Sequence, residues 1–110
     1  MIVKLYKNLI NSLNGLKIVI GEKSFILELI LGIFLIPYIF ISNIEFNHKL
    51  LLLILYFLLL VSEILNTSIE KLADKFTKSF DNDIKNIKDL GSAAVFLIIT
   101  LLIIIFVLTF

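Results

Sequence analysis

The chain has 110 residues, of which 60% are hydrophobic and 17% are charged, and its mean hydropathy is +1.10. A soluble chain of this length buries only about two-thirds of its surface, so it could not hide this much apolar surface from water, whereas a lipid bilayer could accept it. The net charge of +1 gives no reason to expect nucleic acid as a partner, and the lack of cysteine excludes disulfides and thiol chemistry. One small integral membrane domain of the all-α class is therefore predicted.

Residues 1–22 are predicted to form an amphipathic helix that lies on the membrane surface. Leu5, Leu9, Leu13 and Leu16 recur at helical spacing and share one stripe, while the lysines and asparagines lie mostly elsewhere. A helix that packs on a partner or is soluble is the alternative interpretation.

Three transmembrane helices are expected to follow. Residues 25–42 are apolar except for Glu28 and form the first span, which a short polar connection joins to the second span at residues 50–76. The second span would be about 40 Å long at 1.5 Å per residue. The hydrocarbon core is only about 30 Å thick, so the polar C-terminal end of this helix should project into water. Residues 77–88 read as a polar linker or surface segment, and residues 89–110 as the third span.

The lysines predict the orientation in the membrane. Four precede the first span, five lie in the polar end of the second span and the linker after it, and one lies in the remaining connection. By the positive-inside rule, the N-terminus and the second connection are expected in the cytoplasm and the C-terminus outside.

Four polar side chains share one edge of the second span. Glu63, Asn66, Glu70 and Asp74 are spaced i, i+3, i+7 and i+11, which places them within an arc of about 80° on a helix. Glu63 follows closely on a long apolar run, and a charge near the bilayer centre costs about 2.5–3.5 kcal/mol. Such a carboxyl suits a general base or a proton carrier, although it could also join helices as a hydrogen-bonding group.

Two other stretches carry candidate site residues. Glu22 and Glu28 flank the start of the first span, and Glu22 is expected near the headgroups, level with Glu70. A carboxylate pair together with phosphate oxygens suits Mg²⁺, but Glu22 could also be an ordinary surface charge. At the start of the third span, Asp89 is expected to cap the helix and Lys88 to meet a phosphate. Capping and close helix packing alone would also explain this segment.

The same residues resemble a known family. Residues 63–70 read Glu-Ile-Leu-Asn-Thr-Ser-Ile-Glu, Asp74 follows, and residues 88–95 read Lys-Asp-Leu-Gly-Ser-Ala-Ala-Val. These motifs and their spacing resemble the bacterial integral-membrane diacylglycerol kinases, strongly over residues 60–96. The resemblance implies a homotrimer in the bacterial inner membrane with active sites between protomers at the cytoplasmic interface. It also implies that MgATP phosphorylates the free hydroxyl of diacylglycerol to give phosphatidic acid.

Carried over residue by residue, the resemblance implies that Glu63 is the general base and that Glu22 and Glu70 bind Mg²⁺. The implied nucleotide contacts are Lys4, Glu22, Asn66, Glu70, Asp74, Lys88 and Asp89, and the implied contacts to the lipid substrate are Ser12, Glu28, Glu63 and Ser92. The N-terminal third departs from the family pattern. Ile26 stands where the family has an arginine, the chain has no arginine at all, and Lys4 is expected to replace an early one.

Three other functions remain open at this point. Undecaprenol kinases share the fold and motif but usually carry Ala-Ala-Gly-Ala where this chain has Gly-Ser-Ala-Ala at residues 91–94. A small proton-coupled multidrug transporter would have four spans and short loops. A non-catalytic subunit of a membrane complex would not need the polar edge of the second span.

Overall fold

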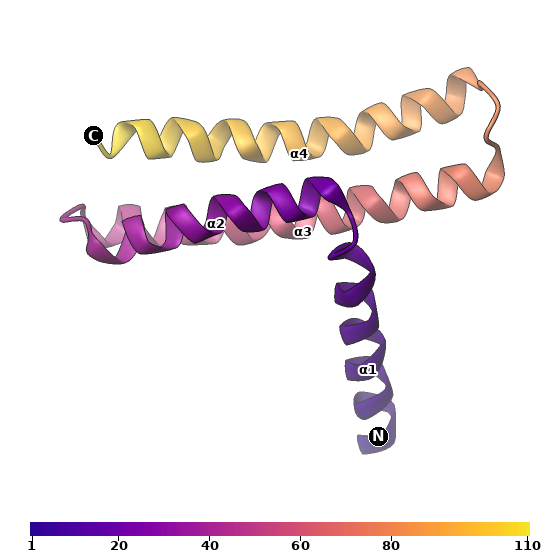
Figure 1. Ribbon diagram of the computed structural model, residues 1–110, viewed down its shortest axis with the longest axis horizontal. Helices are drawn as coiled ribbons and strands as arrows, with labels where there is room; N and C mark the ends of the chain where they lie inside the picture. The colour runs from indigo at the N-terminus through magenta and orange to yellow at the C-terminus, as the bar shows by residue number, and fades with distance from the viewer.

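The computed structural model describes all residues from 1 to 110 and consists of four helices without any strand. Helix α1 spans Ile2–Val19, α2 Lys23–Ile41, α3 Phe46–Phe76 and α4 Asn82–Leu108. Figure 1 shows α2, α3 and α4 running alongside one another, whereas α1 leaves the bundle in a different direction. The predicted all-α class is thus confirmed.

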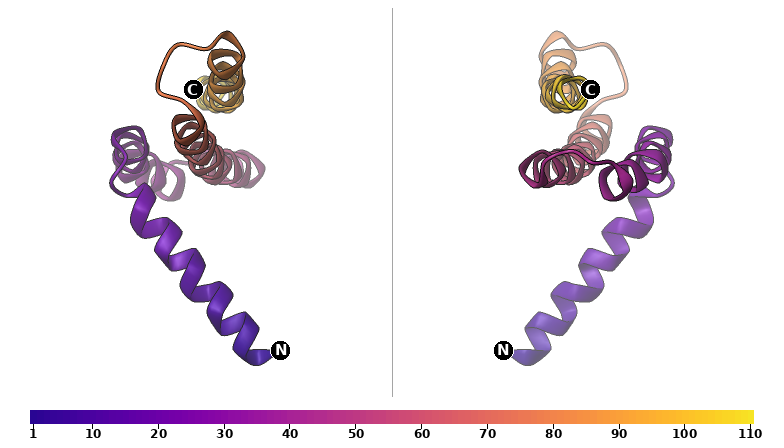
Figure 2. Two further views of the ribbon diagram at one scale, coloured as in Figure 1. Left: turned by 90° about the vertical axis from the view of Figure 1, so that its right-hand side faces the viewer. Right: turned by 90° about the vertical axis from the view of Figure 1, so that its left-hand side faces the viewer.

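Helix α3 is the centre of the bundle. It contacts α4 along much of its length and α2 over a shorter stretch, and the end-on views place α2 and α4 at different sides of it (Figure 2). The buried core between the helices consists of Leu35, Ile39, Leu52, Leu55, Tyr56, Leu59 and Leu102. Because α3 contacts both neighbours, its polar face can bring together residues from α2 and α4.

Most of the apolar surface of the chain is not buried by the chain itself. Only 16 of the 110 residues are buried, and large apolar side chains are exposed on all four helices. Three helices, α2, α3 and α4, are long and apolar enough to cross a membrane. Burial of such side chains in lipid removes the cost of leaving them in water, so the exposed apolar surface fits a membrane protein.

Helix α1 makes almost no contact with the bundle. Val19, at its C-terminal end, is its one buried residue, and its leucines are exposed along the projecting helix. In Figure 1, α1 joins the bundle where α2 begins, while the α3–α4 hairpin continues past that point. This position suits a helix at the membrane surface, and the contact of α1 with lipid stays a prediction.

Two helices, α3 and α4, begin at least one helical turn before the residues expected. Helix α3 begins at Phe46 and not at residue 50, so the connection from α2 is shorter than expected. Helix α4 begins at Asn82, because the Asp81 side chain accepts hydrogen bonds from the backbone N–H groups of Asp83 and Ile84. Such an N-cap satisfies backbone donors that the first turn leaves free. The prediction that Asp89 caps this helix was therefore wrong, and the linker contains residues 77–81 only.

Candidate functional site

The polar edge of α3 runs from the interior of the bundle to its surface. Glu63 and Asn66 are buried, with exposed fractions of 6% and 8%, whereas Glu70 and Asp74 are exposed. Residues 70–89 of the α3–α4 hairpin form one end of the bundle, the polar end. The row of polar groups therefore leads from a buried carboxyl group to a solvent-facing array of charges.

Glu63 lies beside the second carboxyl group that the sequence places within a span. Glu28 of α2 is also buried, and its carboxyl group lies near that of Glu63. The Oε2 atom of Glu28 is buried and has no hydrogen-bond partner. A buried oxygen of this kind is an acceptor that a substrate hydroxyl could use. The structure thus brings together two of the residues expected to contact the lipid.

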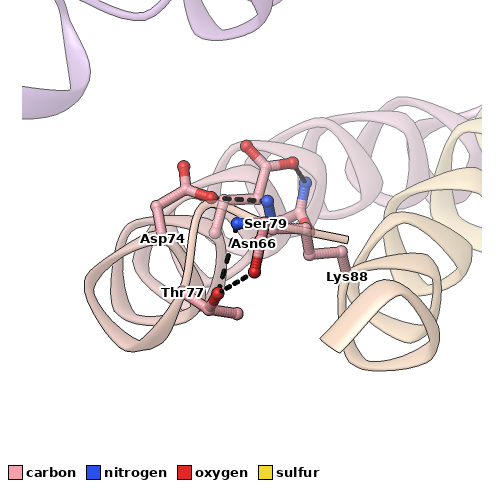
Figure 3. Close-up of polar contacts among 6 residues, drawn as sticks. Asn66, Asp74, Thr77, Ser79 and Lys88 are labelled. Carbon is pink, nitrogen blue, oxygen red and sulfur yellow. Dashed lines mark hydrogen bonds and ion pairs between the residues drawn. The ribbon is translucent and has the colours of Figure 1, made fainter. Parts of the chain in front are cut away.

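Asn66 connects the buried and exposed halves of the row. Its Nδ2 atom donates a hydrogen bond to Oε1 of Glu70 at 3.2 Å, while its Oδ1 atom is buried without a partner (Figure 3). Gly91 of α4 packs against this amide, and a Cβ atom there would collide with Oδ1 of Asn66. The close approach of α4 therefore holds the Asn66 side chain against Glu70.

Two ion pairs order the polar end. Lys88 of α4 donates to Asp74 of α3 at 2.5 Å, as Figure 3 shows, and Lys85 donates to Asp89 at 2.7 Å. The hydrogen bond from Lys88 lowers the pKa of Asp74, and the nearby Lys78 adds to this effect. Asp74 is therefore ionised at neutral pH, and its charge is opposed by more than one lysine.

A polar hollow of about 400 Å³ lies at this end of the hairpin, between the end of α3 and the start of α4. Three of its lining residues are lysines, Lys78, Lys85 and Lys88, and Asp89 also lines it. Lysine ammonium groups bind phosphate as compact point charges. The hollow could therefore accept the phosphates of a nucleotide.

Glu22 forms an ion pair with Lys71 of α3, with its Oε1 atom 3.1 Å from Nζ. Lys71 directly follows Glu70 in the sequence, and joint binding of Mg²⁺ by Glu22 and Glu70 stays a prediction. Nowhere in residues 1–110 do three His, Cys, Asp or Glu side chains gather in a way that could hold a metal ion. Magnesium, however, usually binds through one or two carboxylates plus substrate phosphates. The Glu70 carboxylate, which accepts a hydrogen bond from Nδ2 of Asn66, fits that smaller requirement, and Oδ1 of Asn66 is a further buried oxygen without a partner.

The remaining candidate residues lie apart from this row. Lys4 and Ser12 are exposed on the projecting helix α1, where the Ser12 hydroxyl donates to the Asn8 carbonyl oxygen of its own helix. Ser92 is exposed on α4 directly after Gly91. The structure therefore does not bring Lys4 or Ser12 to the polar edge of α3.

Three contacts were not expected from the sequence. Lys71 pairs with Glu22, Lys85 pairs with Asp89, and the Tyr56 hydroxyl donates to the backbone carbonyl of Glu28. The i, i+4 spacing of Lys85 and Asp89 was a usable signal. No pattern in the sequence indicates the other two contacts, because each joins helices whose rotation about their axes is fixed only by packing.

Comparison with known proteins places the chain in a family. Residues 10–110 match the family model for prokaryotic diacylglycerol kinase. A diacylglycerol kinase of Pseudomonas aeruginosa is 33% identical over 82 residues, which cover 74% of this chain and 67% of that protein. A diacylglycerol kinase of Sinorhizobium sp. is 37% identical over 84 residues, which cover 76% of this chain and 61% of that protein. The chain therefore belongs to the prokaryotic diacylglycerol kinase family.

Proposed function

We propose that this protein is an ATP-dependent lipid kinase that transfers the γ-phosphoryl group of ATP to the hydroxyl of diacylglycerol and releases phosphatidic acid. The reaction would take place at the cytoplasmic face of the bacterial inner membrane. Membership of the family supports the kinase activity, and the names of the two relatives support diacylglycerol as the acceptor.

The observation that carries the proposal is the arrangement along α3. A buried carboxyl group, Glu63, shares one helix edge with the Asn66–Glu70 hydrogen bond and the Asp74–Lys88 ion pair. Phosphoryl transfer depends mainly on positioning the reactants and neutralising charge. This reaction needs a base beside the hydroxyl of the lipid acceptor and cations beside the phosphates of the nucleotide. In this proposal, Glu63 is that base at the level of the lipid, and the lysines of the polar end are those cations.

In this proposal, Glu63 accepts the proton of the lipid hydroxyl as the oxygen attacks the γ-phosphorus. Glu28, whose carboxyl group adjoins that of Glu63, orients the hydroxyl, and Ser12 and Ser92 approach the lipid from α1 and α4. Ser12 reaches this position only if α1 lies along the membrane surface. A general base in contact with the reacting proton typically contributes about 10²–10⁴-fold to the rate.

The nucleotide would bind at the polar end. Lys88 would contact phosphate oxygens. Asp74 pairs with Lys88 and Asp89 pairs with Lys85, and both aspartates would also contact the nucleotide. Lys4 would add a contact from α1. Glu70, Asn66 and Glu22 are the residues that would hold Mg²⁺, and the ion would neutralise charge on the phosphates. Glu22 becomes available for this role only when Lys71 releases it.

The orientation and the homotrimer are parts of the same proposal. The excess of lysine beside the polar end supports a cytoplasmic location. Ser92, Ala93 and Ala94 of α4 have small, exposed side chains, which would let a helix of a second protomer approach closely. Cross-linking of the purified protein in detergent micelles, followed by mass spectrometry, tests for the trimer.

The activity is tested by transfer of ³²P from MgATP to lipid in mixed micelles, with dioleoylglycerol and undecaprenol offered separately. Labelled phosphatidic acid is the expected product. If undecaprenyl phosphate is the only labelled product, the protein is a lipid kinase whose acceptor is undecaprenol and not diacylglycerol. No labelled lipid from folded protein with either acceptor would contradict the proposal.

A further inference from the structure

Tyr56 contacts the helix that carries Glu28. It lies seven residues before Glu63, and therefore on nearly the same face of α3, and its side chain is 3% exposed. Its hydroxyl donates to the backbone carbonyl oxygen of Glu28 at 2.9 Å. A buried tyrosine usually needs a partner for its hydroxyl, and here that partner belongs to the residue whose carboxyl group adjoins Glu63.

Gly32 provides the space for this contact. It lies one helical turn after Glu28 on α2, and a Cβ atom at this position would collide with the hydroxyl and ring carbons of Tyr56. The aromatic ring is rigid and the site is buried, so a side chain on residue 32 would force α2 and α3 apart. The hydrogen bond to Glu28 therefore depends on the missing side chain of Gly32.

Together the two residues fix how α2 sits against α3. A hydrogen bond to a backbone carbonyl constrains both the rotation and the height of the helix, whereas apolar packing of leucines against each other tolerates small shifts. The constrained carbonyl is that of Glu28 itself, so any movement of α2 at this point changes the position of the Glu28 carboxyl relative to Glu63.

We propose that Tyr56 is a positioning residue, whose hydroxyl, seated against Gly32, holds Glu28 opposite Glu63 and so sets the geometry of the buried carboxyl pair. The inference rests on the proposed function, in which Glu63 is the base and Glu28 orients the acceptor hydroxyl. Loss of the constraint lowers kcat because the acceptor is misoriented. The KM for MgATP is unaffected, because the nucleotide contacts lie at the polar end.

Tyr56→Phe removes the hydroxyl and keeps the ring. We expect kcat for diacylglycerol to fall about fivefold, which is the factor that corresponds to one lost neutral hydrogen bond, while the KM for MgATP stays within about twofold. Tyr38→Phe is the matched control, because its hydroxyl also bonds within the bundle, to Thr109 at 2.7 Å, but near the C-terminal ends of α2 and α4. Equal kcat in Tyr56→Phe and wild type, or an equal fall in both variants, would overturn the inference.

A second pair of variants tests the fit between Tyr56 and Gly32. Gly32→Ala is expected to lower both the thermal stability and kcat, because the added methyl group collides with Tyr56. Adding Tyr56→Leu removes the colliding atoms, so the double variant should recover stability but not the full kcat, since the hydroxyl is still missing. A double variant no more stable than Gly32→Ala would contradict the role assigned to Gly32.

A measurement without turnover separates this inference from the kinase proposal. The coupling between Glu28→Gln and Glu63→Gln is measured by a double-mutant cycle of unfolding free energies, in wild type and in Tyr56→Phe. A smaller coupling in Tyr56→Phe is expected. If no lipid is phosphorylated but the coupling falls, the kinase proposal fails and Tyr56 still holds the pair. If lipid is phosphorylated and the coupling is unchanged, Tyr56 is not a positioning residue.

Discussion

At the scale of single residues, the polar edge of α3 combines two buried side chains, Glu63 and Asn66, with two exposed ones, Glu70 and Asp74. The row formed by Glu63, Asn66, Glu70 and Asp74 follows from helical spacing alone, because the positions of residues on one helix depend only on its period. The pairing of Glu22 with Lys71 does not follow in this way. It depends on where α2 begins relative to α3, and local sequence patterns do not encode that relation.

Lys88 is the residue whose removal should most directly weaken nucleotide binding. Lys88→Met deletes a charge that bonds Asp74 and lines the polar hollow, and hydrogen bonds to charged groups are worth about 1.5–3 kcal/mol. The lysine is partly exposed, so we expect the lower end of this range, a rise of about tenfold in the KM for MgATP. Lys75→Met is the control, because Lys75 is an exposed lysine on α3 outside the hollow. An unchanged KM for MgATP in Lys88→Met would show that Lys88 does not contribute to nucleotide binding.

At the scale of helices, the three apolar helices were predictable because their length and hydropathy are local properties. The ends of these helices were harder to predict from the sequence. The start of α4 at Asn82 is set by the Asp81 side chain, yet the polar composition of residues 77–88 concealed this cap. The close approach of α4 to α3 also depends on Gly91, because Asn66 occupies the space that a side chain at residue 91 would need. The sequence alone does not indicate this contact.

Gly91→Ala tests whether α4 holds the Asn66 amide in place. The added methyl group meets the Asn66 oxygen, which is the end of a side chain that can rotate away, so we expect little loss of thermal stability. Rotation breaks the hydrogen bond to Glu70, and misplacement of this kind can lower kcat by about 10- to 100-fold. The control is Gly15→Ala, where no heavy atom lies within 4 Å of the added methyl group. Gly15→Ala should leave kcat unaltered and stabilise helix α1 slightly. Equal kcat in Gly91→Ala and Gly15→Ala would contradict this role.

At the scale of the whole molecule, the all-α architecture and its candidate spans could be expected from composition. The way in which α2 and α4 use different sides of α3 could not, because it depends on side-chain packing between helices that are distant in sequence (Figure 2). Orientation in the membrane and assembly into a homotrimer both stay predictions.

The lack of native cysteine makes this orientation directly measurable. Asn43→Cys places a thiol between α2 and α3, and Ser79→Cys places one between α3 and α4. A membrane-impermeant maleimide applied to intact spheroplasts should label the thiol at position 43 and spare the one at position 79, and lysis should expose the latter. Labelling of position 79 in intact cells would reverse the proposed orientation.

We propose that the buried carboxyl of Glu63 acts as the base in lipid phosphorylation at the polar edge of α3. This role is tested by comparing ³²P transfer to dioleoylglycerol by wild type, Glu63→Gln and Glu45→Gln, with binding of MgATP measured in parallel. Glu45 is an exposed glutamate in the connection between α2 and α3, remote from the polar end. We expect Glu63→Gln to lose about 10²–10⁴-fold in rate and still to bind MgATP, and we expect Glu45→Gln to match wild type. Full activity in Glu63→Gln would contradict the role of Glu63 as the base.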